Sequence, residues 1–577
     1  MEHAPTAESV EREVRGNVLA QAVGAGTVAD LDLSHEFVSR LTDRALRAWF
    51  VGRFRVVVGG AGVAAAAVPA RPAKVGSPLN RIPRLARDGL LGCLCALVRD
   101  GARTVAELEG AGFPVDLLRY FGGPGAGGLD EWLGGIAARL ARGEPAARVV
   151  KSLQFRPVPA VAGFRVISDC GADAVQHMRL QWERHGRFVG EGDGSCADLL
   201  ESVARFAIGE GVGVEVVSDR LPDGLAEGVE FRAQAPAPGQ WARDAGVGGS
   251  CGGRLVRLAP WFVTVGEATS DLVPADDLAA AEDARSALLF QGGDVIVYQD
   301  GVRRQRVALV GEAEVARNHA LGLSAEQAVE ALRVEFGVDR VVVLPAASFH
   351  IDQEVSVRSV AGGAPVAFVP DVLGGAGVVI RACLERLKGE AGAAAALESL
   401  ARARGRDVLD RVWAVVGPYR QLDGHWPLAL AERLSAGPGD NPVAHFQRFL
   451  GALDEWTAAV VSPEELADPY ARAFLRSLKR RSKDRASVRA ALAGLGLRVV
   501  GVPAMPDDGR GVNPLNMVHG PGFVLMPTVG GVLGALDVVA AGVVREAVGA
   551  GVRVVSIPSG ESQCRDGGVR CSVSCAG

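Results

Sequence analysis

The sequence predicts an α/β fold with a helical region in front of it and a helical segment inserted into it. Short runs rich in β-branched residues begin after Gly163 and are separated by glycine, proline and aspartate, which is typical of strands. Helical patterns lie between several of these runs, so strands and helices alternate along the chain. The flanking and inserted regions instead place apolar residues at helical spacing.

The predicted strands share β-branched residues and turn residues at their ends. They are residues 214–217, 295–298, 341–344, 367–369, 497–500, 523–526 and 552–557. Helices are predicted between them at residues 325–336 and 535–548, where apolar residues recur every three or four positions.

The chain divides into two predicted domains. Residues 1–155 are expected to form a mostly helical accessory domain, as the pattern of residues 39–50 and 133–140 indicates, and Pro157 and Pro159 follow it. Residues 156–577 are expected to form the α/β domain, with a helical insertion at about 393–491. A basic run inside the insertion is interpreted as a solvated helix face.

Composition excludes several classes of protein. Of 577 residues, 48% are hydrophobic and 22% charged, which are globular values, and the net charge of −5 does not favour nucleic acid or an anionic membrane as a partner. The longest apolar stretch, residues 56–70, is shorter than the roughly 20 residues that cross a bilayer. The N-terminus lacks the basic and apolar regions of a secretory signal. We therefore expect a cytoplasmic protein whose nine cysteines are reduced thiols.

A histidine and an aspartate follow the predicted strand at residues 341–344, in the segment Phe349-His350-Ile351-Asp352. Residues two apart in an extended segment point the same way, so both side chains are expected to face one cavity. The imidazole of His350 could transfer protons, and the carboxylate of Asp352 could bind a cation. A structural histidine is the alternative interpretation.

Cys571 is a candidate nucleophile in the segment Gly567-Gly568-Val569-Arg570-Cys571. Glycines allow a bound group to approach the backbone closely, and an arginine beside a loop cysteine is expected to lower the pKa of the thiol. The alternative is a metal site or disulfide formed by Cys564, Cys571 and Cys575. Their spacing is not a zinc pattern and no histidine lies nearby, so we expect no metal and no cofactor.

Two further segments carry candidate binding residues. Trp241-Ala242-Arg243-Asp244 combines a tryptophan that could line a pocket with a carboxylate that could bind a planar cation bidentately, although Arg243 and Asp244 could also form a structural ion pair. Gln291-Gly292-Gly293-Asp294 precedes a predicted strand and would present Gln291 or Asp294 at the start of that strand.

Four of these segments, in their order along the chain, resemble the guanidine-modifying enzymes of the pentein fold. They are W-A-R-D-A-G, Q-G-G-D-V, F-H-I-D and G-G-V-R-C. These enzymes include agmatine, arginine and protein-arginine deiminases, dimethylargininases and amidinotransferases. The resemblance covers residues 163–577 without the insertion. It implies an α/β propeller of five pseudo-symmetric ββαβ units.

The resemblance also implies a reaction and roles for the quoted residues. Cys571, His350, Asp352 and Asp244 would be catalytic, and a guanidinium group would be hydrolysed to a ureido group and ammonia through a covalent thiouronium intermediate. The residues expected to line the substrate site are Trp241, Arg243, Gln291, Asp294 and Arg570. The substrate would be arginine-like, free or within a protein, or agmatine-like.

Two positions depart from the family pattern. Val247 stands where agmatine deiminases usually have proline, and Gln291 stands where the family often has an acid that holds the catalytic histidine. Asp294 or Glu354 could replace that acid. The stretch at residues 513–518 is similar to protein-arginine deiminases. Two alternative functions stay open: an amidinotransferase that uses the same cysteine and histidine, and a catalytically silent guanidine-binding protein.

Overall fold

The structure is a computed structural model that describes the α/β region and part of the helical region before it. The described residues are 90–110, 113, 115–121, 128–153, 155–182, 196–218, 226–233, 241–264, 272–274, 284–320, 323–345, 350–360, 363–378, 472, 476, 485–504, 512–530, 534–563 and 567–577. Among them, no helix is both long enough and apolar enough to cross a bilayer.

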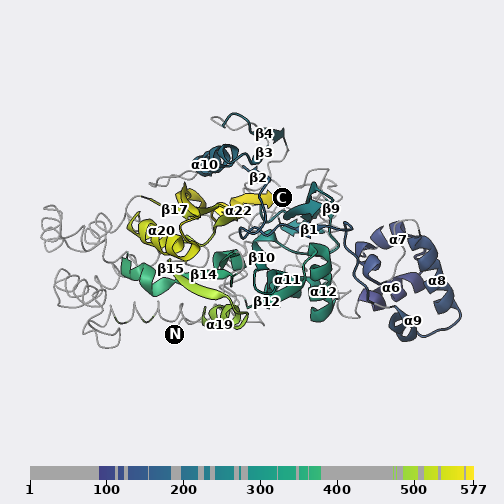
Figure 1. The fold of residues 1–577 in the computed structure, drawn as a ribbon. Helices are drawn as coiled ribbons and strands as arrows, with labels where there is room; N and C mark the ends of the chain where they lie inside the picture. Colours follow the sequence, from purple (N-terminus) through teal and green to yellow (C-terminus); the bar gives the residue numbers. More distant parts are fainter. Residues whose placement is uncertain are drawn as a thin grey trace, which may run out of the picture.

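Five sheets of the described residues repeat one strand pattern, an antiparallel pair followed by a strand parallel to the second member (Figure 1). The first sheet has the order β1 (Arg165–Val166), β5 (Val247–Cys251), β6 (Arg254–Ala259) and β9 (Ala284–Arg285). Three sheets have three strands each: β10 (Val295–Asp300), β11 (Gln305–Gly311) and β12 (Arg340–Leu344); β13 (Ser356–Arg358), β14 (Val366–Asp371) and β15 (Arg498–Pro503); β16 (Val518–Gly520), β17 (Phe523–Thr528) and β18 (Arg553–Pro558). The fifth has the order β19 (Val573–Ala576), β2 (His177–Gln181), β3 (Gly213–Ser218) and β4 (Glu230–Ala233). A small hairpin of β7 (Phe262–Thr264) and β8 (Leu272–Pro274) completes the strands of the described chain.

Helices connect the parallel strands, so the predicted α/β class is confirmed. They are α10 (Cys196–Gly209), α11 (Glu312–Ala320), α12 (Ala325–Phe336), α19 (Ala486–Gly494) and α20 (Gly534–Val548). The short helices are α21 (Gly560–Gln563), α22 (Val569–Ser572), η4 (Gly292–Asp294) and η5 (Ile351–Gln353). Each predicted strand begins within one residue of the start of a strand in the structure, and both predicted helices are present.

Helix α12 shows why the sequence forms helices at these places. Ser324 and Gln327 form a capping box at its N-terminus, which satisfies two backbone N–H groups that have no partner inside the helix. Gly337 ends the helix with a left-handed φ of 60°. A Cβ there would lie 2.0 Å from the carbonyl oxygen of Phe164, so only glycine fits this end of the helix.

The C-terminal strand brings the end of the chain to its middle. β19 pairs with β2 in an antiparallel register in which Val573 lies opposite Leu180. Since α22 leads directly into β19, this pairing fixes the position of Cys571 relative to the other sheets.

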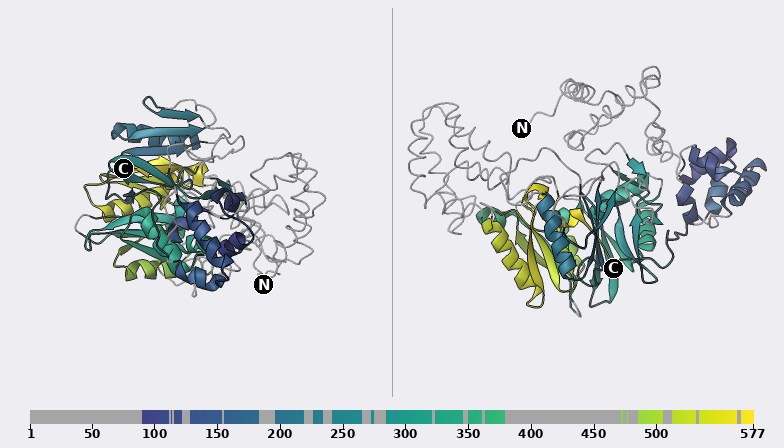
Figure 2. Two further views of the ribbon diagram at one scale, coloured as in Figure 1. Left: turned by 90° about the vertical axis from the view of Figure 1, so that its right-hand side faces the viewer. Right: turned by 90° about the horizontal axis from the view of Figure 1, so that it is seen from above.

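The helices before residue 155 lie at one end of the molecule, on the side opposite α20 (Figure 2). They are α6 (Leu90–Arg99), α7 (Val105–Gly110), η2 (Val115–Phe121), α8 (Leu129–Ala141) and α9 (Ala146–Ser152). Their apolar side chains share one core cluster with α12, and the side chains of Arg119 and Tyr120 hydrogen-bond the buried carboxylate of Glu335. The division into domains at residue 155 stays a prediction.

Several predicted segments fall outside the described residues. The helix at residues 39–50 is one, and the insertion at 393–491 is another, apart from residues 472 and 476 and its last residues, which begin α19.

His519 is a buried histidine between two sheets. It lies on β16, is 1% exposed, forms a hydrogen bond of 2.7 Å between Nε2 and Ser356 Oγ, and stacks on Phe368. Burial, together with the positive charge of Arg358, lowers the pKa of His519 to about 3. The imidazole is therefore neutral in the folded protein at neutral pH.

We expect His519 to make the fold sensitive to acid. Its pKa is lower in the folded than in the unfolded chain, so the unfolded state takes up the proton first as the pH falls below about 6.5. The free energy of unfolding should then decrease by up to about 1.4 kcal/mol per pH unit from this group. Denaturant unfolding of the wild type and His519→Gln at several pH values measures the effect. The gap in stability between them should shrink toward low pH, and a constant gap would contradict the assignment.

Candidate active site

The predicted site residues occupy equivalent places in the sheets, each just before the first strand of the repeated pattern. Asp244 precedes β5, Gln291 precedes β10, and His350 and Asp352 precede β13. Cys571 precedes β19. Because the repeated units present these segments in the same way, residues far apart in the sequence come together.

The structure brings the four predicted catalytic side chains into one cluster. Cys571 Sγ lies 3.6 Å and 3.9 Å from the two carboxylate oxygens of Asp352, and His350 Nδ1 lies 3.8 Å from Asp244 Oδ1. The negative charges of both aspartates act on the thiol of Cys571. A Cβ on Gly293 would lie 2.5 Å from His350 Nδ1 and 3.0 Å from Asp244 Oδ1, so glycine allows these side chains to meet.

Two local conformations differ from the prediction. His350 is extended, but Asp352 lies in the 3-10 helix η5, so the two residues are not in one extended segment. Cys571 lies in the single helical turn α22 and not in a loop. Hydrogen bonds around Asn516 hold this turn: its carbonyl oxygen accepts from Arg570 N–H and its Oδ1 accepts from Cys571 N–H.

The prediction that Arg570 lowers the pKa of the Cys571 thiol is wrong. Burial and the carboxylates of Asp352 and Asp244 raise the pKa of Cys571 well above its ordinary value. The guanidinium of Arg570 points instead at Asp169 Oδ2, at 2.8 Å, and at Asp352 Oδ2, at 2.9 Å. In the absence of a cationic ligand, the thiol form is therefore favoured.

Arg570 and Arg243 are buried and bound within the protein, and their place in a substrate site stays a prediction. Arg243 is 1% exposed, donates to the carbonyl oxygens of Gly292 and Val295 and pairs with Asp169 at 2.9 Å. Burial alone would raise the pKa of Asp169, but the two arginines lower it. Likewise burial would lower the pKa of Arg570, and the carboxylates of Asp169 and Asp352 raise it.

Gln291 contacts the imidazole of His350. Its Oε1 lies 2.7 Å from His350 Nε2 and accepts a hydrogen bond of 2.8 Å from Arg317 Nη2 on α11. Because arginine only donates, the atom facing both groups is the amide oxygen, and His350 Nε2 donates to it. The amide therefore occupies the place in which an acid was expected.

Both acids suggested as a replacement have partners other than His350. Glu354 is paired with Arg485, at 2.5 Å. Asp294 is buried, accepts the Ile351 N–H at 2.9 Å and faces Glu314, and burial together with Glu314 raises its pKa well above the ordinary value. Asp294 thus supports the start of η5, and its place in the substrate site stays a prediction.

Solvent reaches the cluster from the side of Asp244. The side chain of Asp244 is 22% exposed, whereas Cys571, His350 and Asp352 are 3%, 2% and 0% exposed. Trp241 and Gln291 are also partly exposed. The Trp241 ring covers Gly567, where a Cβ would lie 2.2 Å from the ring. These three residues therefore form the accessible edge of the cluster.

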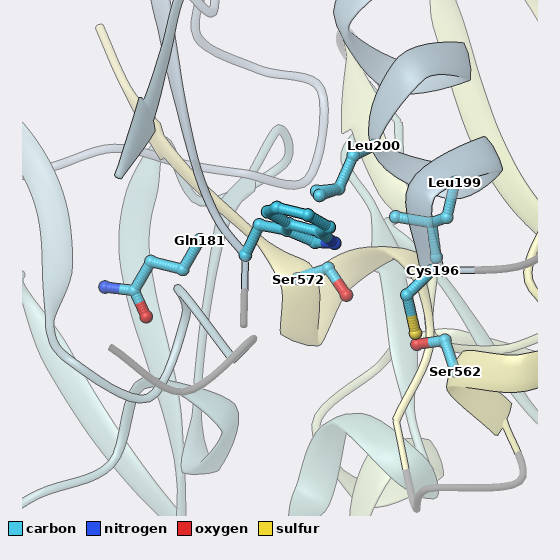
Figure 3. Close-up of a pocket in the computed structure, with 7 residues that line it drawn as sticks. Gln181, Cys196, Leu199, Leu200, Ser562 and Ser572 are labelled. Carbon is cyan, nitrogen blue, oxygen red and sulfur yellow. The ribbon is translucent and has the colours of Figure 1, made fainter. Parts of the chain in front are cut away.

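A small pocket lies beside Ser572 of α22 (Figure 3). It is lined by Gln181, Trp182, Cys196, Leu199, Leu200, Ser562 and Ser572. None of these side chains carries a negative charge, so the pocket offers no counter-charge for a guanidinium group.

Metal binding finds no support in the part of the chain that the structure describes, where no group of three or more His, Cys, Asp or Glu side chains is arranged to hold an ion. Cys571 and Cys575 are free thiols, and Cys564 lies outside the described residues.

Sequence analysis missed the amides around the cysteine. Asn516 Nδ2 and Gln353 Nε2 lie 3.1 Å and 3.3 Å from Cys571 Sγ. Asn516 precedes β16, the first strand of its sheet, so its place in the repeat is the same as that of the predicted residues. Asp169, by contrast, has no sequence signal of this kind.

Comparisons with known proteins show a similarity in fold. No family model matches the sequence, and no curated protein does. Agmatine deiminase of C. jejuni has 13% identity and a TM-score of 0.39, with 72% of this chain and 96% of that chain covered. Agmatine deiminase of Enterococcus faecalis has 14% identity and a TM-score of 0.40, with 73% and 97% covered.

These structural neighbours are deiminases. They belong to the class of enzyme that the motifs resemble. At such identities and TM-scores, a functional conclusion has to come from the residues of this chain.

Removal of Arg570 should destabilise the protein strongly. Arg570→Met would leave Asp352 buried without its cation and Asp169 with Arg243 only, which should cost about 3–5 kcal/mol of unfolding free energy. Denaturant unfolding measures this loss. Arg205→Met is the matched control, because Arg205 pairs with Glu201 at the surface and is 72% exposed, and it should change stability by less than about 1 kcal/mol. Equal losses in the two variants would show that the buried pairs do not hold the fold.

Proposed function

We propose that the protein is a deiminase that hydrolyses a guanidinium group to a ureido group and ammonia. The observation that carries the proposal is a buried thiol, Cys571, which lies 3.6 Å from Asp352 Oδ2 and whose pKa is raised by burial and by the carboxylates of Asp352 and Asp244. The carboxylates of Asp169, Asp352 and Asp244 outnumber the guanidinium groups of Arg243 and Arg570, which pair with Asp169 and Asp352, by one negative charge. A planar guanidinium would supply the balancing positive charge, because carboxylates bind this group through paired hydrogen bonds.

The charge of the substrate would also activate the nucleophile. A guanidinium between Asp244 and Asp352 offsets the two negative charges that disfavour the Cys571 thiolate. The thiol of Cys571 gives its proton to the imidazole of His350, and the resulting thiolate forms a bond to the central carbon of the guanidinium. Because the thiolate forms only when the substrate is bound, the thiol of Cys571 is protected from other reactions in the free protein.

His350 would move the protons of the two half-reactions. As the tetrahedral adduct collapses, the C–N bond breaks and the imidazolium gives its proton to the departing nitrogen, which leaves as ammonia. The neutral imidazole then takes a proton from the water that attacks the thiouronium carbon. The C–S bond breaks, the thiolate of Cys571 is released, and the ureido product forms.

Gln291 would keep the imidazole in position for these steps. Its amide oxygen accepts from His350 Nε2, which directs Nδ1 toward Asp244 and the partly exposed side of the cluster. This contact supports a catalytic role of His350 although the expected acid is missing. It therefore weakens the alternative of a catalytically silent guanidine-binding protein.

We also propose that the five sheets close into a propeller of the pentein type, with residues 156–577 as its domain and residues 1–155 as an accessory domain. Five repeats of one strand pattern and the pairing of the C-terminal β19 with β2 support this arrangement.

A screen for ureido product tests the reaction. The purified protein should release ammonia and form a ureido group from at least one of agmatine, arginine, methylated arginine and an arginyl peptide, without an added amine acceptor. Cys571→Ala should reduce turnover by at least about 1,000-fold. Cys251→Ala, which changes a cysteine whose thiol donates to Ala162 O, is the control and should keep activity. Product formed only with an amine acceptor would indicate an amidinotransferase instead.

Asp244→Asn should change two properties of Cys571 in opposite directions. Without the carboxylate, the pKa of the thiol falls, so alkylation by uncharged iodoacetamide at about pH 8 should become faster. Turnover of the guanidine substrate should decrease, with kcat/KM lower by about 100-fold, because one side of the cation loses its ion pair. Slower alkylation together with slower turnover would point to general damage and contradict this role.

A further inference from the structure

The sulfur of Cys571 lies between two buried side-chain amides. Asn516 Nδ2 is 3.1 Å from Sγ and Gln353 Nε2 is 3.3 Å from it. Asn516 is 1% and Gln353 5% exposed. Which atom of an amide faces a sulfur decides its effect, because an N–H donor favours the thiolate and a carbonyl oxygen opposes it.

The orientation of Asn516 is fixed by the backbone of the cysteine itself. Cys571 N–H donates to Asn516 Oδ1 at 3.0 Å. A backbone N–H can only donate, so the atom it meets is the amide oxygen and the NH2 group faces the sulfur.

The orientation of Gln353 is fixed through a further residue, Asn513. Leu515 N–H donates to Asn513 Oδ1 at 3.1 Å, so the NH2 group of Asn513 points the other way. This NH2 group donates to the carbonyl oxygen of Gln353 at 2.8 Å and to Gln353 Oε1 at 2.9 Å. With its oxygen held by Asn513, Gln353 presents its NH2 group to the sulfur.

We propose that Asn516 and Gln353 are the donors that stabilise the anionic sulfur of Cys571, and that Asn513 is a positioning residue that holds Gln353 in the donating orientation. The role in catalysis rests on the proposed function, in which Cys571 is the nucleophile. Asn513 acts only through Gln353.

The choice of amides has a physical reason. Burial and two carboxylates oppose the thiolate, so the sulfur needs stabilisation from another source. A lysine or arginine at this place would supply it but would repel a guanidinium substrate and compete for Asp244 and Asp352. Neutral donors stabilise the sulfur anion without placing a further cation beside Asp244 and Asp352, of which Asp352 already binds Arg570. The hydrogen bond from Asn516 and one from the backbone N–H of Gly568 lower the pKa of Cys571 against the carboxylates.

Asn513→Asp tests the positioning role because it changes one donor into an acceptor. The retained oxygen can still accept from Leu515 N–H, while the second carboxylate oxygen would face Gln353 Oε1. Repulsion should turn the Gln353 amide over, so that its oxygen faces the sulfur. Gln353→Leu removes the donor without this reversal, and the double variant completes a cycle.

The measurement is the rate at which uncharged iodoacetamide alkylates Cys571, followed by mass spectrometry from about pH 7 to about pH 11. Asn513→Asp should slow alkylation at about pH 8 by about tenfold more in the wild-type background than in the Gln353→Leu background. The reason is that one hydrogen bond to the charged sulfur lowers the pKa of the thiol by about one unit or more. The added charge acts in both backgrounds and cancels in this comparison.

Equal effects of Asn513→Asp in the two backgrounds would overturn the positioning role. Asn318→Asp is the matched control: it alters a buried asparagine that donates to Leu289 O, and it should leave the pH profile of Cys571 unchanged. A change of the same size in this control would also overturn the proposal. Alkylation needs no guanidine turnover, so the two proposals can be told apart. If Asn513→Asp and Gln353→Leu are coupled in the alkylation cycle but the protein has no deiminase activity, the proposed function is refuted and the donor arrangement stands.

Discussion

Arg570 supplies the interaction on which the arrangement of the site depends, because it is a buried cation between two buried carboxylates. Its guanidinium binds Asp169 and Asp352 and also donates to the carbonyl oxygen of Val295, and Arg243 binds the same oxygen of Asp169, Oδ2. A buried charge is tolerated only when it is paired, so these groups hold one another in place. The segments before β5, β10, β13 and β19 are joined in this way, and Cys571 is the residue that follows Arg570.

Opposing electrostatic effects meet at the sulfur of Cys571. Burial, Asp352 and Asp244 favour the thiol, while amide and backbone N–H groups favour the thiolate. The balance in the described structure lies on the side of the thiol. Arrival of a cation would shift it, since the carboxylates would then be neutralised while the donors stay. In the proposed reaction, a positively charged substrate would therefore favour the thiolate, and a neutral one would give no comparable advantage.

The contacts of the site residues that the sequence did not predict have a common cause. Arg243, Asp294 and Arg570 lie in the same short motifs as the cluster residues, and the sequence offered no means to tell which side chains of a motif face inward. Side chains of a motif that do not face the cluster bind other parts of the protein. Arg243 and Arg570 bind Asp169, and Asp294 binds the backbone of η5. Gln291 shows the opposite case, because an amide that departs from the family pattern still contacts His350.

The sequence by itself determined the α/β class, the places of the seven predicted strands and of the two helices predicted between them, and the segments that carry Cys571, His350, Asp352 and Asp244. These features depend on local periodicity, turn residues and short motifs, which are written in neighbouring residues. Only the tertiary structure decided that Arg570 pairs with Asp169, that Gln291 meets His350 and that Asn516 and Gln353 face the sulfur. Their partners are more than fifty residues away in the chain, and such contacts follow from how the sheets assemble, for which no local pattern carries the information.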